Sequence, residues 1–206
     1  MSASPASQYC STLHHIVYGT IQGEHSDPDK PRTTEVNAME LSDEEKHVRS
    51  VGALVGNLQS LEFLLRGFLS TVHDADPSGL LPGMPRDLTS LTIGQSVPEN
   101  HMTNYDSLES LVDKYNTYMS GKNPSLLLDK QVVVLRDALA HGRVFQEVSR
   151  TKFQLLKFDR PVGGAACVVF SETMDSNWFK RRAELVITQV SKVLQACKSF
   201  ASTMIV

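Results

Sequence analysis

The fold is decided by residues 42–72, which have the sequence SDEEKHVRSVGALVGNLQSLEFLLRGFLSTV. Ser42 and Glu45 have the spacing of a capping box, in which each side chain accepts a hydrogen bond from a backbone N–H group at the start of a helix. Apolar residues then recur every three or four positions, which is the period of a helix with one buried face. These residues are Val48, Val51, Val55, Leu58, Leu61, Leu65, Phe68 and Val72. The stretch therefore predicts one long amphipathic helix over 43–72.

A second long helix is predicted at the C-terminal end of the chain, beginning near Asp175. Its apolar residues alternate four and three positions apart, which gives a narrow seam suited to one partner helix. They are Phe179, Ala183, Val186, Val190, Val193, Cys197 and Phe200. The helix over 43–72 is long enough to be that partner, so we expect the two helices to pack along each other.

Two shorter helices are predicted between the long ones. The first follows a polar cap at Asn104 or Asp106 and ends near Gly121. The second starts at Asn123 and Pro124, with asparagine as the cap and proline at the first helical position. Gly142 is expected to end it in the left-handed conformation. Because the turn between the two helices is short, we expect them to pack antiparallel.

The other segments are loops and strands. Residues 73–103 are rich in proline and glycine and form an unusually long loop, which either covers a groove or simply connects two helices. The apolar runs 153–158 and 166–170 flank the turn 159–164, which predicts a β-hairpin. A two-stranded hairpin is marginal alone, so it is expected to lie on the helices.

Together these elements predict an all-α fold, an up-and-down helical bundle of four main helices with an inserted β-hairpin. The chain has 206 residues, enough for one sizeable core, and we assign a single helical domain to 42–206. Residues 1–41 are expected to form a variable N-terminal arm and linker, because small polar residues and prolines surround one short apolar island.

Composition limits the classes of function. No apolar run is long enough to span a bilayer and no signal-peptide pattern is present, so we expect a cytoplasmic protein without membrane association. The net charge of −3 argues against a grip on long nucleic acid but leaves room for a local basic groove. The 3 cysteines lack metal-ligand spacing and are expected to be reduced, with Cys167 and Cys197 in or near the core. Neither a metal nor a cofactor is expected, since no phosphate-binding loop, nucleophile elbow or zinc-helix motif occurs.

The densest group of chemically capable side chains is the nonamer LRDALAHGR, residues 135–143. Asp137 and His141 are four positions apart and share one helix face, close enough for the carboxylate to accept a hydrogen bond from the imidazole. Arg136 and His141 diverge by about 140° around the axis, at about 100° per residue. Only the length of the arginine, or a second copy of the helix, therefore brings both to one substrate. Histidine exchanges protons at physiological pH, and arginine binds phosphate in a bidentate manner.

The nonamer resembles the Arg-polar-xxx-His signature of the HEPN superfamily, small all-α domains. Many members are metal-independent endoribonucleases in toxin–antitoxin, phage-defence and RNA-processing systems. The Ala-His-Gly-Arg continuation is also typical of that superfamily, and the resemblance covers roughly 42–206. It implies that His141 transfers a proton, that Arg136 binds the phosphate and that Asp137 orients the imidazole. It also implies a homodimer that brings two motifs together across a cleft, and an antitoxin or larger effector as a further partner.

Six basic residues are expected to contact the RNA substrate. Three of them follow the motif, and three lie near the start of the last helix, where the helix dipole disfavours cations. They are Arg143, Arg150, Lys152, Lys180, Arg181 and Arg182. A solvated helix face is the alternative explanation for the second group.

Two other functions remain open from the sequence. The first is a catalytically inactive HEPN-like domain that binds a protein partner or a nucleotide. The second is a purely structural dimeric scaffold, in which Arg136 and Asp137 are solvated and His141 only caps the carbonyl groups at the helix end.

Overall fold

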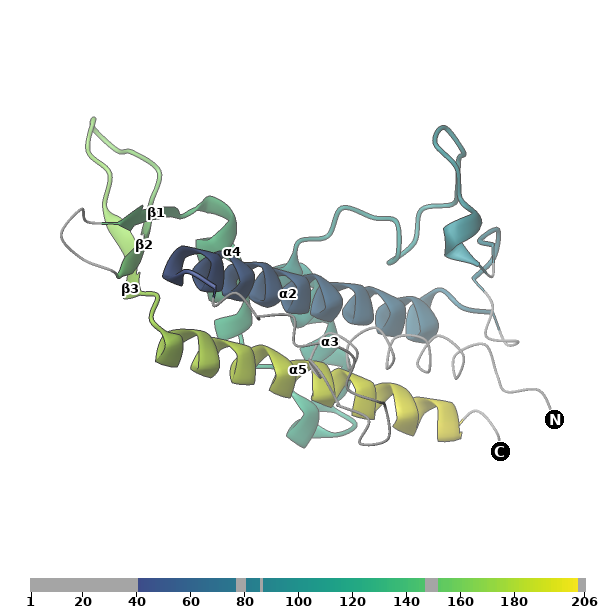
Figure 1. The fold of residues 1–206 in the computed structure, drawn as a ribbon. Helices are drawn as coiled ribbons and strands as arrows, with labels where there is room; N and C mark the ends of the chain where they lie inside the picture. Colours follow the sequence, from purple (N-terminus) through teal and green to yellow (C-terminus); the bar gives the residue numbers. More distant parts are fainter. Residues whose placement is uncertain (1–40, 77–80, 86, 147–151, 204–206) are drawn as a thin grey trace, which may run out of the picture.

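The computed structural model describes residues 41–76, 81–85, 87–146 and 152–203 (Figure 1). This part of the chain contains four α-helices and a three-stranded sheet. Within these ranges, none of the helices combines the length and the apolar character needed to cross a membrane. The N-terminal arm predicted over 1–41 lies, apart from Leu41, outside the described residues.

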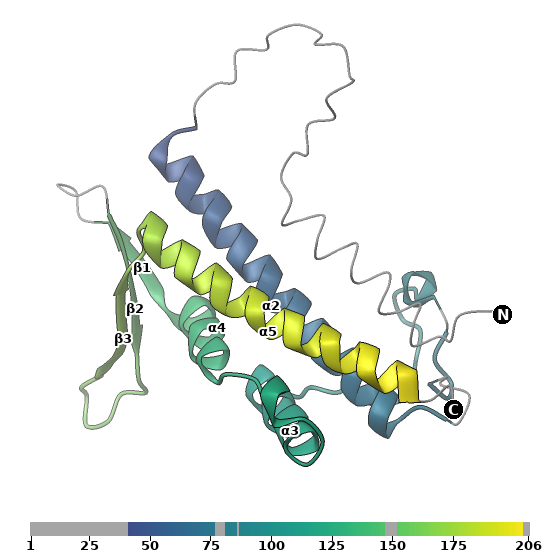
Figure 2. The ribbon, with the colours of Figure 1, turned by 90° about the horizontal axis from the view of Figure 1, so that it is seen from below.

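Two long helices form the body of the molecule. Helix α2, Asp43–His73, and helix α5, Ser176–Thr203, lie side by side, as Figures 1 and 2 show from two directions. The predicted capping box starts α2, because the Glu45 N–H donates to the Ser42 hydroxyl at 3.2 Å and the Ser42 N–H donates to the Glu45 carboxylate at 2.8 Å. The pairing of the two long helices, predicted from their apolar seams, is confirmed. Fully buried side chains of both helices meet in the core, among them Leu61, Leu65, Leu69, Val186 and Val193.

The prediction of an all-α bundle is wrong, because three strands rather than two follow the motif helix. Strands β1, Arg143–Gln146, β2, Phe153–Phe158, and β3, Val168–Thr173, pair antiparallel in that order. The hairpin of β2 and β3 is the predicted one. Strand β1 has only four residues, all exposed, and lacks the alternation of apolar and polar residues that marks a strand in sequence. It forms because β2 offers a free edge with unpaired backbone groups. The fold is therefore mixed α and β.

The far end of the hairpin extends beyond the helices (Figure 1). Cys167 lies there and is exposed, so its predicted place in or near the core is wrong. Cys197 of α5 is partly buried and packs against the core, as predicted.

The motif helix is shorter than the sequence pattern predicted. Asn123 and Pro124 start only one 3-10 turn, η2, Pro124–Leu126. The motif helix itself, α4, covers Gln131–His141. Its chain then passes through Gly142 in an extended conformation, φ −74° and ψ 172°, rather than in the predicted left-handed one.

Side chains from neighbouring helices hold residues 127–130 out of a helix. The Asn116 amide of α3, Leu108–Ser120, accepts a hydrogen bond from the Leu128 N–H at 2.7 Å and donates to the Leu128 carbonyl at 3.0 Å. The buried Gln189 of α5 accepts from the Asp129 N–H at 3.0 Å. Because this segment separates α3 from α4, α3 packs on α2 and η2 instead of lying along α4.

The long loop between α2 and α3 is tied to the C-terminal half of α2. The Arg66 guanidinium donates to the backbone carbonyls of His101, Asn104 and Asp106, at 3.2, 3.0 and 2.6 Å. Asp74 hydrogen-bonds both the backbone N–H and Nδ1 of His101, each at 2.8 Å. In Figure 1 this end of α2 lies opposite the sheet, so the loop does not cover the motif.

His47 joins the other end of α2 to the sheet and to α5. Its ring stacks on Phe153 of β2, with 3.8 Å between the ring centroids and 26° between the planes. It also meets the ring of Phe179 edge-on, at 5.4 Å. Burial among these rings lowers the pKa of His47, so the folded protein favours the neutral imidazole.

Acidification is expected to destabilise the protein through His47. The unfolded chain takes up a proton around the ordinary pKa of 6.5, whereas the folded chain resists protonation. The stabilisation that His47 contributes to the folded state is therefore complete above pH 6.5. It is lost as the pH falls from there through the lower pKa of His47 in the folded state. His47→Phe keeps the ring contacts and should flatten the decline of the unfolding free energy with falling pH, measured by urea titration. His73→Gln, which removes an exposed imidazole, should keep the wild-type slope; an equal slope in all three proteins contradicts the prediction.

Candidate active site

Helix α4 presents Arg136, Asp137 and His141 in its last two turns, beside the sheet. The spacing of four residues brings His141 Nε2 to 3.7 Å from Asp137 Oδ1. This is an ion-pair distance and is longer than a hydrogen bond, so the predicted hydrogen bond between the two side chains is not formed. The His141 side chain is 65% exposed, so most of the imidazole is open to a substrate.

Lys157 of β2 completes this group, although the sequence did not point to it. Its Nζ donates a hydrogen bond to Asp137 Oδ2 and forms an ion pair with that carboxylate. Asp137 therefore stands between a lysine on one oxygen and the imidazole on the other. Lys157 thus anchors the carboxylate across the boundary between helix and sheet.

The signal for Lys157 was present in the sequence only in part. Alternation along β2 puts Lys157 on the same face as the buried Leu155, and a cation on an inward face needs a carboxylate partner. The sequence offers many carboxylates and does not say which one folds against β2.

Arg136 is half-buried on α4. Among the residues that the structure describes, its guanidinium has no hydrogen bond or ion pair. A planar cation with five donors and no internal partner is suited to bind a phosphate. Its divergence from His141, about 140° around the helix axis, means that one chain does not bring the two into contact.

One of the predicted RNA-binding residues borders this group, since Arg143 begins β1 two positions after His141. Lys152 is exposed just before β2, at the end of the sheet away from His141, because Phe153 pairs with the last residue of β1. Lys180 and Arg181 are exposed on the first turns of α5. Arg150 lies outside the described residues.

Arg182, the remaining predicted RNA-binding residue, is engaged within the fold. It forms an ion pair with Glu172 of β3, and its guanidinium lies 5.8 Å from the ring centroid of Trp178. The Trp178 indole N–H also donates to Glu172. A cation near the start of α5 therefore has a structural reason, which is to join that helix to the sheet.

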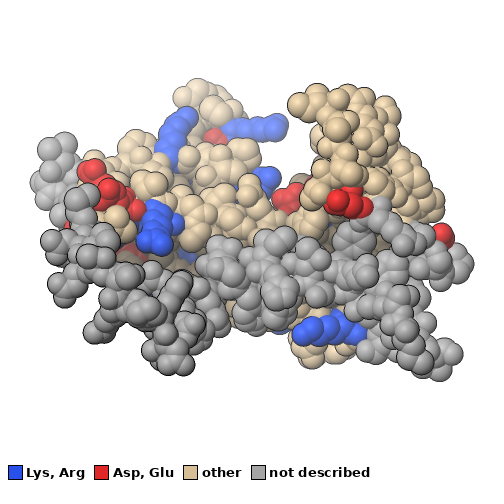
Figure 3. All heavy atoms as spheres, turned by 45° about the vertical axis from the view of Figure 1, so that its right-hand side comes forward, with Lys and Arg blue, Asp and Glu red and all other residues tan. Residues whose placement is uncertain are grey.

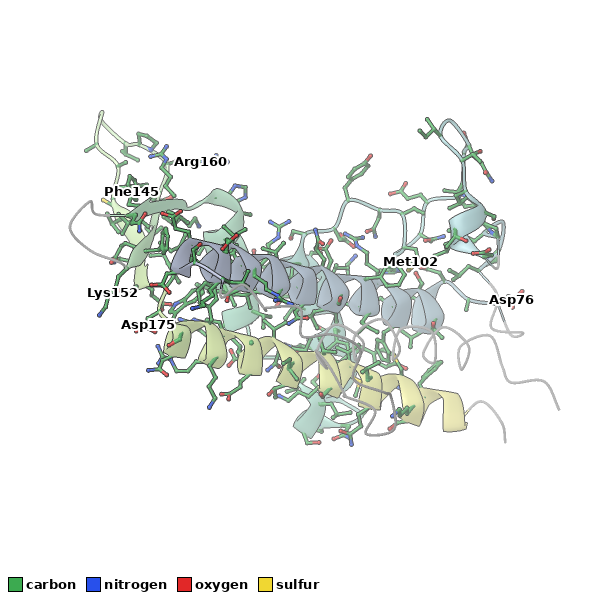
Figure 4. All side chains as sticks on the ribbon, in the orientation of Figure 1. Asp76, Met102, Phe145, Lys152, Arg160 and Asp175 are labelled. Atoms are coloured by element: carbon green, nitrogen blue, oxygen red, sulfur yellow. The ribbon has the colours of Figure 1, made fainter. Side chains whose placement is uncertain are left out.

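Among the described residues visible in Figure 3, blue and red side chains are interspersed, and the basic ones do not form a continuous stripe. Figure 4 shows Lys152 and Arg160 at the sheet end of the molecule. Such a distribution is compatible with contact to a few phosphates at one place rather than along a nucleic acid of many turns.

An open groove of about 960 Å³ between the end of α2 and α3 lies away from this group. It has His73, His101 and Tyr118 in its wall and contains none of the predicted site residues. Across the described ranges, no cluster of three or more histidines, cysteines, aspartates or glutamates is placed to hold a metal ion.

Comparison of the chain with models of known protein families, with curated proteins and with solved structures gives no match. The motif nonamer and the geometry around it are therefore the basis on which a function is proposed.

Proposed function

We propose that the protein is a metal-independent endoribonuclease of the toxin or phage-defence type. The observation that carries this proposal is the exposed His141 imidazole, which faces Asp137 while Lys157 anchors that carboxylate from the sheet. An Arg136 without a partner in the described part of the chain lies on the same helix. The resemblance of the nonamer to the HEPN signature supports the same reading.

In the proposed reaction, the RNA supplies its own nucleophile. The 2′-oxygen forms a bond to the adjacent phosphorus while the bond from phosphorus to the 5′-oxygen breaks. The 2′-hydroxyl proton passes to a base, and a proton reaches the departing 5′-oxygen, so the products are a 2′,3′-cyclic phosphate and a 5′-hydroxyl. His141 carries out one of these transfers. Arg136 binds the phosphate and stabilises the charge that develops in the transition state.

The single imidazole leads us to expect a homodimer. One histidine supplies only one of the two proton transfers, and Arg136 diverges from His141 within one chain by about 140°. A second copy would supply the second imidazole and the arginine on the facing side. A cytoplasmic location and control by an antitoxin or larger effector belong to the same proposal.

The same divergence also favours a second candidate, a catalytically inactive HEPN-like domain that binds a protein partner or a nucleotide. In such a domain the motif of each chain would act alone. Arg136 would then provide an anion contact, and His141 would need no second imidazole.

Incubation of the purified protein with total RNA in EDTA tests the proposal. We expect cleavage whose 3′ ends carry 2′,3′-cyclic phosphates, so that they become ligatable only after end repair. Cleavage that requires added divalent metal would overturn the metal-independent mechanism. RNA that stays intact over a wide range of protein concentrations would leave the binding module as the better reading.

A further inference from the structure

The sheet has two chemically different faces. Leu155 is buried, and Lys157 on the same side reaches Asp137, so this face rests on the helices. Strand alternation sends the other side chains to the opposite face. The outer-face residues are Arg143, Phe145, Gln154, Leu156, Phe158, Ser171 and Thr173.

The outer face combines aromatic rings with a cation. The Arg143 guanidinium lies 5.5 Å from the ring centroid of Phe158, which also confirms that the two side chains share this face. Phe145 is 47% exposed, an unusual exposure for so large an apolar ring. Strand geometry, at about 3.4 Å per residue, puts the two rings roughly 14 Å apart, far enough to contact different bases of one strand.

The charge and polarity of this face select among partners. Within the three strands as described, the only carboxylate is Glu172, which points to the helices and pairs with Arg182. The outer face instead carries a connected amide and hydroxyl group, since Gln154 donates to Ser171 at 3.0 Å and accepts from Thr173 at 3.2 Å. One exposed ring, Phe145, one partly exposed ring, Phe158, a cation and neutral hydrogen-bonding groups make a surface without a carboxylate, which fits unpaired bases on a phosphate backbone.

The outer face begins next to the end of the helix that carries the candidate active site. Strand β1 begins at Arg143, two residues after His141. Figure 4 shows Phe145 and Arg160 at this same end, on the sheet and on the turn beyond β2. An RNA strand that contacts Arg143 on the outer face would therefore lie near the end of α4, whereas Lys157 and Asp137 meet on the opposite face of the sheet.

We propose that the outer face of the sheet is a stacking platform for single-stranded RNA, with Phe145 and Phe158 contacting bases and Arg143 contacting a phosphate. This inference rests on the proposed function, because it names the substrate class of that site. Such a face selects unpaired RNA, since the bases of a duplex are stacked on each other and cannot lie on a protein ring.

The test is binding of a short single-stranded RNA whose 2′-hydroxyls are methylated, so that cleavage cannot occur. One base is 2-aminopurine, whose fluorescence reports stacking. Phe145→Ala is expected to weaken binding roughly ten-fold and to abolish the fluorescence change, whereas Phe145→Tyr should retain both. Val144→Ala is the matched control, since Val144 is the neighbouring residue on the opposite face and is equally exposed, at 49%. Arg143→Gln should reduce the salt dependence of binding by about one phosphate contact.

The outcomes separate this inference from the proposed function. If Phe145→Ala binds the oligonucleotide like wild type, the platform is overturned, even where the wild type cleaves RNA. If Phe145→Ala leaves binding intact but dissociates a dimer in sedimentation, the outer face is an interface between copies instead. If the wild type binds with the expected fluorescence change yet cleaves no unmodified RNA, the stacking platform is supported and the proposed nuclease function is overturned.

Discussion

Replacement of His141 by alanine is expected to lower the rate of RNA cleavage roughly 10²- to 10⁴-fold, which is what a positioned acid–base group contributes. Arg136→Ala should cost about 10²- to 10³-fold, as expected for the loss of one donor to the charge of the transition state. Single-turnover cleavage of a labelled RNA in EDTA measures both effects. Because His141 is 65% exposed and Arg136 has no partner in the described part of the chain, both variants should keep the fold.

His73 offers a matched control for His141. Both are exposed histidines at the last position of an α-helix, His73 in α2 and His141 in α4. His73→Ala should therefore cleave like wild type. If the wild type cleaves RNA and the His141→Ala variant cleaves it at the same rate, catalysis lies elsewhere in the chain, and the motif has only a structural role.

The role of Asp137 predicts a graded result in the same assay. Asp137→Asn keeps the shape but removes the charge that faces His141 Nε2, and Lys157→Met removes the anchor while keeping the carboxylate. Since both residues act through the imidazole, each variant should lose less activity than His141→Ala. A loss as large as that of His141→Ala in either variant would contradict this supporting role.

The parts of the fold that sequence could predict are those decided by local periodicity. The apolar residues of α2 and α5 follow a helical period over many turns, and Ser42 and Glu45 mark the start of α2 within four positions. The pairing of α2 with α5 could be predicted because the apolar seams of the two helices have similar lengths. In the candidate site, the closeness of Asp137 and His141 is likewise a property of one helix.

The parts that could not be predicted depend on neighbours distant in sequence. Strand β1 owes its structure to the edge of β2, and the late start of α4 owes its position to Asn116 and Gln189, which bind the backbone of residues 128 and 129. Lys157 reaches Asp137 from twenty residues away. No period or motif encodes such contacts, because they depend on how the elements pack and not on their own composition.

Gly142→Ala is expected to destabilise the protein by roughly 2–3 kcal/mol, the cost of forcing atoms into a filled space. Gly142 has a negative φ of −74°, so conformational freedom is not the reason for glycine. A Cβ there would collide with the carbonyl oxygen of Ala138, and would lie 2.7 Å from Leu155 Cδ1 and 3.1 Å from the Leu156 oxygen. Two of these three atoms belong to the backbone, so the strain cannot be relieved by a side-chain rotation alone. Urea unfolding followed by far-UV circular dichroism measures the loss.

Gly121→Ala is the matched control for this prediction. Gly121 also follows the last residue of a helix, with φ −86°, but a Cβ there would meet nothing within 4 Å. This variant should therefore be neutral or slightly more stable, by up to about 1 kcal/mol, through the lower entropy of its unfolded state. Equal stabilities of the two variants would show that the junction between α4 and β1 can yield. If the junction is rigid, Gly142→Ala should also turn His141 away from Asp137. The cleavage rate per folded molecule of this variant should then fall as well, because the packing of Gly142 would determine the position of the imidazole.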